Sequence, residues 1–99
     1  MIHIEIWNAK RDAEFKFMNF DYTDSKIDLT QYPKFYDKVY EYTTDEYKDL
    51  PPLRVLNRLY EKFNLYRPDD FRGHSMSVSD IITLDGVPYY CDSFGFKEI

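Results

Sequence analysis

The stretch that decides the fold runs Ile81-Ile82-Thr83-Leu84-Asp85-Gly86-Val87-Pro88-Tyr89-Tyr90. An Asp-Gly pair between β-branched and aromatic residues predicts a two-residue hairpin turn, because both central positions of a type I′ turn need positive φ. We therefore predict strands over residues 74–84 and 87–94, joined by this turn. The turn fixes a register that pairs Leu84 with Val87, Ile82 with Tyr89, Asp80 with Cys91, and Val78 with Ser93.

The two faces of this predicted hairpin differ in polarity, because successive side chains of a strand point to opposite sides. One face is the more apolar and is predicted to meet a helix: Met76, Val78, Asp80, Ile82, Leu84, Val87, Tyr89 and Cys91. The other is rich in hydroxyls and is predicted to face solvent or a partner: Ser75, Ser77, Ser79, Ile81, Thr83, Tyr90, Asp92 and Phe94.

The rest of the chain predicts further strands and one helix. Apolar residues alternate over 2–6, and a second strand around Phe15 and Phe17 is predicted to pair back on the first. Residues 21–34 read as irregular, and 36–43 as a strand. Two prolines at 51 and 52 open a helix whose predicted buried stripe is Leu53, Leu56, Leu59, Tyr60 and Phe63.

These elements predict a single α+β domain over residues 1–99. Residues 1–49 supply N-terminal strands and an acidic connector, 50–65 the helix, and 66–99 the hairpin segment. The predicted fold is a small antiparallel sheet of four to five strands with one main helix packed on one face.

Composition limits the classes of function. The formal net charge is −5, which disfavours direct nucleic-acid binding and favours a protein partner with a basic surface. Ten Tyr and eight Phe suit both a small core and a contact surface. Cys91 is the single cysteine and no long apolar run occurs, so we expect a cytoplasmic protein with no internal disulfide and no membrane association.

The sequence gives little support to catalysis. A Cys/His dyad would need Cys91 beside a histidine, but the predicted strand places His74 about 20 Å away. A Ser/His/Asp set would join His74, a serine and Asp80 or Asp92, yet neighbouring positions point to opposite faces. With two His, one Cys and three Gly, neither a metal site nor a phosphate loop is predicted. We expect no catalytic residue, no metal and no cofactor.

The remaining polar residues have structural interpretations. Cys91 is expected to be a small buried residue. Asp80 is expected to accept hydrogen bonds from local backbone or hydroxyls, with Arg72 as its nearest counter-ion. Asp92 is expected to pair with Ser79 across the strands. The alternative is that these carboxylates anchor a partner.

Two segments of the chain carry a family signature. The first runs Arg67-Pro68-Asp69-Asp70-Phe71-Arg72-Gly73-His74-Ser75-Met76-Ser77-Val78-Ser79-Asp80, and the second runs Tyr89-Tyr90-Cys91-Asp92-Ser93-Phe94-Gly95-Phe96. Over about residues 59–98 the chain resembles the YodL-like family. The resemblance implies an origin in a phage, plasmid or integrative element and no established catalytic activity. Gly73 and Gly95 are expected to relax the backbone at the ends of the hairpin.

The favoured hypothesis is a non-catalytic binding protein that occludes a basic, nucleic-acid-handling surface of a host-defence complex such as a CRISPR nuclease. Its acidic side chains would mimic phosphates and its tyrosines would supply contact area: Glu41, Asp45, Glu46, Asp49, Tyr40, Tyr42 and Tyr47. The polar hairpin face adds Tyr90, Asp92 and Phe94. One alternative is a regulatory or assembly module that binds a protein of its own element or forms a homodimer. Another is a hydrolase that uses the Ser-rich strand.

Overall fold

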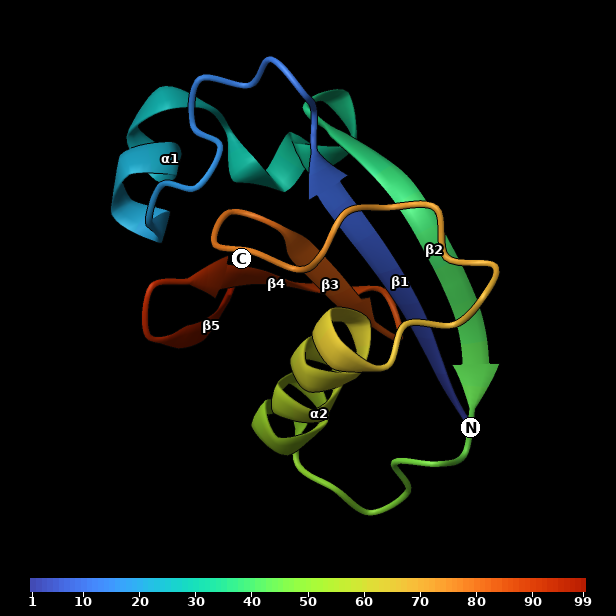
Figure 1. Cartoon of the computed structure of the whole chain (residues 1–99). Helices are drawn as coiled ribbons and strands as arrows, with labels where there is room; N and C mark the ends of the chain where they lie inside the picture. The colour runs from blue at the N-terminus through green and yellow to red at the C-terminus, as the bar shows by residue number, and fades with distance from the viewer.

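The computed structural model describes residues 1–99 and shows a five-stranded antiparallel sheet with helices on both faces (Figure 1). The sheet order is β2-β1-β3-β4-β5. The strands are β1 (Ile2–Ala9), β2 (Tyr36–Thr44), β3 (Ile81–Leu84), β4 (Val87–Asp92) and β5 (Gly95–Glu98). The helices are α1 (Phe20–Lys26), the 3-10 helix η1 (Leu29–Lys34) and α2 (Pro52–Leu65). The predicted α+β class and sheet are confirmed.

The predicted Asp-Gly hairpin forms between β3 and β4. Asp85 and Gly86 both have positive φ, at 49° and 85°, as a type I′ turn requires. The pairs Leu84–Val87 and Ile82–Tyr89 are confirmed, and the Cys91 amide donates to the carbonyl of Asp80 at 2.8 Å. The chain then turns again at Gly95, whose φ is 98°, and residues Gly95–Glu98 pair with β4 as the edge strand β5.

The predicted strand over 74–84 is too long, because only Ile81–Leu84 pairs as β3. Ser79 adopts a φ of 88°, and the Asp80 side chain accepts hydrogen bonds from the amides of Ser77 and Ala9. A carboxylate that binds nearby backbone amides competes with the strand ladder. Residues 74–80 therefore leave the sheet, and the predicted Val78–Ser93 pair is not part of the β3–β4 register.

The predicted strand around Phe15 and Phe17 is wrong, because β1 pairs with β2 on one side and β3 on the other. Tight turns occupy this region: the Lys16 amide bonds the Ala13 carbonyl, and Phe17 has a φ of 70°. The segment predicted to be irregular also contains α1 and η1. The side chains of Asn19 and Asp28 cap these two short helices by accepting from Tyr22 and Thr30.

Helix α2 packs on one face of the sheet as predicted (Figure 1). Its buried residues are Val55, Leu56, Leu59 and Phe63, in contact with Ile4, Ile6, Ile82 and Leu84 of the sheet. Leu53 and Tyr60 are 57% and 37% exposed, so their assignment to the buried stripe was wrong. Val55, which the prediction left out of the stripe, is buried against the sheet, whereas Leu53 faces solvent.

Within the paired strands β3 and β4, the hydroxyl-rich face of the hairpin does not face solvent. Ile81, Thr83 and Tyr90 are all 0% exposed. Ala9, Phe15, Leu29, Tyr36, Ile81 and Tyr90 form a second apolar cluster beneath the segment that carries α1 and η1. The sheet thus has a core on both faces, which explains why β3 is buried along its whole length.

Candidate functional site

The predicted contact tyrosines lie mainly against helix α2. Tyr40 packs edge-on against Phe63 and Phe71, with ring centroids 5.6 and 5.8 Å away, and its hydroxyl donates to Asp70. Tyr42 is half-buried beneath the Lys62 ammonium, and burial raises its pKa well above the ordinary value. Tyr47 is only 7% exposed and belongs to the core. All three tyrosines therefore pack against the domain, and only Tyr40 and Tyr42 remain partly exposed at the surface.

The four predicted acidic residues divide between two sites. Glu41 points to the opposite face of β2, where His3 lies 2.9 Å from its carboxylate. Asp45, Glu46 and Asp49 remain exposed in the loop after β2. Asp85 joins them at this end of the sheet, because its carboxylate accepts from the amide of His3 at 2.8 Å. We call the exposed group Asp45, Glu46, Asp49 and Asp85 the acidic end.

The predicted residues of the hairpin face are mostly internal. Tyr90 is 0% exposed, and its hydroxyl lies 2.6 Å from that of Thr23 and donates to the carbonyl of Met18. Asp92 accepts from the amides of Phe20 and Ser93 rather than pairing with Ser79. Phe94 is fully exposed at the β4–β5 turn, so it is the member of this group that offers a free surface.

The motif residues around Asp80 meet more closely than the sequence predicted. His74 Nδ1 lies 3.7 Å from Asp80, whose backbone pairs with Cys91, because residues 74–80 are not an extended strand. The estimated 20 Å separation was therefore wrong, and the basic side chain within 4 Å of the Asp80 carboxylate is His74 rather than Arg72. Burial raises the pKa of Asp80, while the His74 charge and hydrogen bonds from Ala9 and Ser77 lower it; the net direction is upward.

The side chains in this arrangement connect neighbouring loops by hydrogen bonds, and they do not form an activated nucleophile. Ser79 is fully buried, and its hydroxyl accepts from the amide of Phe17 at 3.0 Å. The Ser77 hydroxyl donates to Asp80 at 3.2 Å. Cys91 is 2% exposed as predicted, and burial raises the pKa of its thiol to about 12, so that the neutral form prevails at neutral pH.

A basic hollow of about 380 Å³ lies at the opposite end of β1 from the acidic end, next to Asn8. The cationic residues that line it are Arg11, Lys16 and Arg72, together with His74 and one carboxylate, Asp37. Asn8 is 4% exposed; its carbonyl accepts from the His74 amide, and its Nδ2 has no partner. Sequence reasoning missed this grouping, because it comes from three segments that only the fold brings together.

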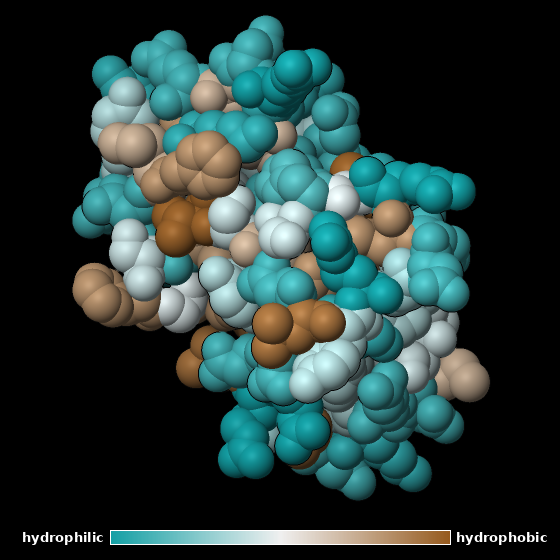
Figure 2. All heavy atoms as spheres, in the orientation of Figure 1, coloured by the Kyte–Doolittle hydropathy of each residue, from teal (hydrophilic) through white to brown (hydrophobic).

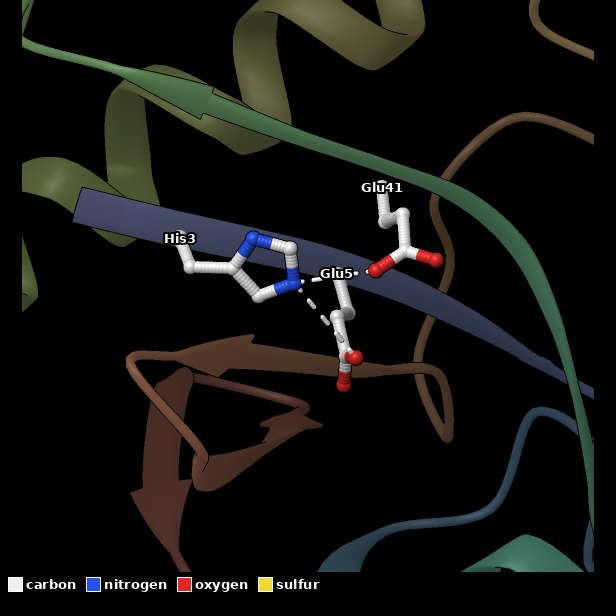
Figure 3. A group of neighbouring side chains, drawn as sticks. All are labelled: His3, Glu5 and Glu41. Carbon is white, nitrogen blue, oxygen red and sulfur yellow. Dashed lines mark hydrogen bonds and ion pairs between the residues drawn. The ribbon is translucent and has the colours of Figure 1, made fainter.

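The sequence also did not predict a second group of polar side chains, on strands β1 and β2. It lies on the sheet face opposite α2, in the part that α1 and η1 leave uncovered. His3, Glu5 and Glu41 place an imidazole nitrogen and two carboxylate oxygens within 4.8 Å of one another (Figure 3). His3 and Glu5 are two residues apart on β1, and Glu41 lies opposite Glu5 on β2. The alternation of His3 and Glu5 was visible in the sequence, but the position of Glu41 depends on the β1–β2 register.

Fold and surface together define a small α+β domain whose surface is mostly hydrophilic, with hydrophobic residues in small separate groups in the view shown (Figure 2). None of its helices is long and apolar enough to cross a membrane. The chain belongs to the family of YodL-like domains, whose match spans residues 3–99. The family signature therefore covers almost the whole chain, where the sequence motifs indicated only the C-terminal part.

The chain is also similar to a viral protein. The chain is 35% identical over 114 aligned positions to the uncharacterized protein R785 of Acanthamoeba polyphaga mimivirus. That alignment covers the whole of this chain and 94% of the viral protein. No solved structure matches the chain significantly.

Proposed function

We propose that this protein is a non-catalytic binding protein of a mobile genetic element that acts in the cytoplasm of its host. Its acidic end docks on a basic, nucleic-acid-handling surface of a host-defence complex such as a CRISPR nuclease and occludes it. The relation to a viral protein supports the setting. The burial of the Ser79 hydroxyl and the Cys91 thiol supports a binding role over a hydrolytic one.

The observation that carries the proposal is the separation of charge along the sheet. Asp45, Glu46, Asp49 and Asp85 lie where β1 begins and outnumber Lys48 among them. Arg11, Lys16 and Arg72 lie where it ends and outnumber Asp37. A protein polarised in this way meets a basic partner with its acidic end first, because opposite fields steer the encounter. Tyr42 and Glu46 lie next to Lys62 at the junction of this end with α2.

Competition with DNA tests the proposal. A purified CRISPR nuclease–guide complex is mixed with labelled target duplex and increasing amounts of this protein. We expect displacement of the duplex, with an association rate that falls as salt concentration rises. The variant D45K/E46K/D49N should lower that association rate by about tenfold or more at low salt.

A matched variant controls for net charge. D12K/E14K/D69N makes the same change in charge at three exposed acidic positions outside the acidic end and should compete like the wild type. Equal loss in both variants, or no loss in either, would contradict recognition through the acidic end. Direct binding of the wild type to the duplex alone would contradict a protein partner.

A regulatory or assembly module is the second candidate, and the edges of the sheet favour it. Strands β2 and β5 each pair on one side only, and Phe94 projects fully exposed beside β5. An unpaired strand edge can add a strand from a second chain. Light scattering that shows a homodimer, lost in a Phe96→Pro variant that stays folded, would favour this function over the first. A monomer at all concentrations would remove self-association.

A further inference from the structure

Three donor atoms converge on the open half of the sheet, between strands β1 and β2. His3 Nε2 lies 2.9 Å from Glu41 Oε2 and 3.7 Å from Glu5 Oε2 (Figure 3). A Zn²⁺ ion with ligands at about 2.1 Å in tetrahedral geometry would need donor atoms about 3.4 Å apart. The two distances from His3 Nε2 lie on either side of that value, and all three donor atoms lie within 4.8 Å of one another, so side-chain movements of this order would complete three metal–ligand bonds.

The remaining polar atoms of these side chains are held by outer partners. His3 Nδ1 lies 3.2 Å from the hydroxyl of Thr43, which orients the ring. Glu5 Oε1 accepts from Trp7 Nε1 at 3.1 Å and from the Thr83 hydroxyl at 2.9 Å. These contacts leave Nε2 and Oε2 to face the shared centre. Such outer contacts are how proteins orient metal ligands.

The pairing of the strands itself favours a cation at this point. Glu5 and Glu41 lie directly opposite each other in the β1–β2 register, an arrangement of like charges that normally destabilises a sheet. Lys38 lies 3.6 Å from Glu5 Oε2 and 3.0 Å from Glu41 Oε1 and compensates the two charges in the present structure. The same pair of carboxylates could be neutralised by a bound metal ion.

We propose that His3, Glu5 and Glu41 form a binding site for a divalent transition-metal ion of the Zn²⁺ type. One imidazole nitrogen and two carboxylate oxygens are a donor set that suits this class of ion. Water fills the remaining coordination positions, because the His3 and Glu41 side chains are 42% and 45% exposed. Lys38 acts as a competing cation, so its ammonium must move away when the metal binds.

Calorimetric titration with Zn²⁺, and with Co²⁺ followed by its visible absorption, tests this site on the whole chain. We expect the wild type to bind one ion, and His3→Gln or Glu41→Gln to weaken binding by about tenfold or more. Lys38→Met should strengthen binding several-fold, because it removes the competing charge. That increase in affinity distinguishes a specific metal site from non-specific binding to surface carboxylates.

Two further variants complete the test. His74→Gln removes the other histidine of the chain and should leave the affinity unchanged. Circular dichroism checks that each variant is folded. The proposal is overturned if neither the wild type nor Lys38→Met binds Zn²⁺ at millimolar concentration, or if His3→Gln binds as tightly as the wild type.

Discussion

At the scale of single residues, Asp80 connects the two halves of the chain. Its carboxylate is 0% exposed and accepts from the amide of Ala9 at the end of β1 and from Ser77 in its own loop. The Nδ1 atom of His74 lies 3.7 Å from this carboxylate. Because buried donors are costly to leave unpaired, these bonds make the loop of residues 74–80 part of the framework.

Replacement of Asp80 should measure that role. Asp80→Ala leaves the amides of Ala9 and Ser77 without their acceptor and should lower the free energy of unfolding by about 2–4 kcal/mol. Asp80→Asn keeps one acceptor oxygen but turns a donor towards the Ser77 amide, so a smaller loss of about 1–3 kcal/mol is expected. Urea denaturation measures both, with the exposed Asp69→Ala as control. A loss within the error of that control would contradict the structural role.

Gly73 is required by space and Gly86 by backbone conformation. A Cβ on Gly73 would lie 2.4 Å from Asn8 Oδ1 and 2.7 Å from Val39 Cγ2, whereas one on Gly86 would meet nothing within 4 Å. The sequence-based expectation that Gly73 relaxes the backbone therefore gives the wrong reason for this glycine. Gly86 has a φ of 85°, which other residues adopt only at a cost.

The two glycines give a matched pair of variants. Gly73→Ala should lower the free energy of unfolding by about 1–3 kcal/mol, because the clash displaces Asn8 and Val39. Gly86→Ala should cost about 1 kcal/mol through strain alone. Amide chemical shifts distinguish the causes: the first variant should perturb Asn8 and Val39, and the second only the turn. Unperturbed shifts at Asn8 in Gly73→Ala would contradict the packing described.

At the scale of elements, local signals in the sequence predicted local structure well. The Asp85-Gly86 turn and the alternation of residues 2–6 predicted the hairpin and β1, because turn chemistry and a period of two act over a few residues. The strand at Phe15 failed because its alternation comes from one buried ring, Phe15, within a series of tight turns. The second core and the His3–Glu5–Glu41 group depend on long-range register, which no local pattern contains.

Helix α1 is the element with the least support of its own, since seven residues are too few to form a stable helix alone. Its contacts to the sheet are both polar and aromatic. The Phe20 amide donates to Asp92, the Thr23 hydroxyl lies against the Tyr90 hydroxyl, and the Phe20 ring packs edge-on against the Tyr90 ring at 5.5 Å. The Lys97 ammonium adds a contact to the Phe20 ring at 4.5 Å. The stability of α1 therefore depends on strands β4 and β5.

Removal of the Tyr90 hydroxyl should loosen α1 before the sheet. Tyr90→Phe leaves the Met18 carbonyl and the Thr23 hydroxyl without this partner and should cost about 1–2 kcal/mol. Hydrogen exchange should accelerate at the amides of α1 more than at those of β3. Tyr66→Phe, at a tyrosine that is 70% exposed, is the control. Uniform acceleration over the whole domain would contradict a local role.

At the scale of the whole molecule, the polar tyrosines and the thiol are part of the two cores. Tyr36 and Tyr90 are among the largest fully buried side chains, and Cys91, the residue after Tyr90 in β4, is 2% exposed. Burial raises the pKa of Tyr90 and of Cys91 to about 12, and raises those of Tyr36 and Tyr42 further. The fold is thus built for the neutral forms of these groups.

Alkaline conditions should therefore unfold the protein. In the unfolded chain the thiol and the phenols lose their protons at about pH 8.5 and pH 10. Because the folded pKa values are raised, the folded state binds more protons above these values, and its stability decreases as pH rises from about 9 to 12. The combined loss should be on the order of 5 kcal/mol by pH 11, enough to unfold many small domains.

Urea denaturation at several pH values measures this loss, and tyrosinate absorbance shows whether the buried phenols ionise together with unfolding. Cys91→Ala should start less stable but lose less between pH 8 and pH 11, because one of the titrating groups is gone. A free energy of unfolding that stays constant up to pH 11 would show that these groups are not held in the interior as described.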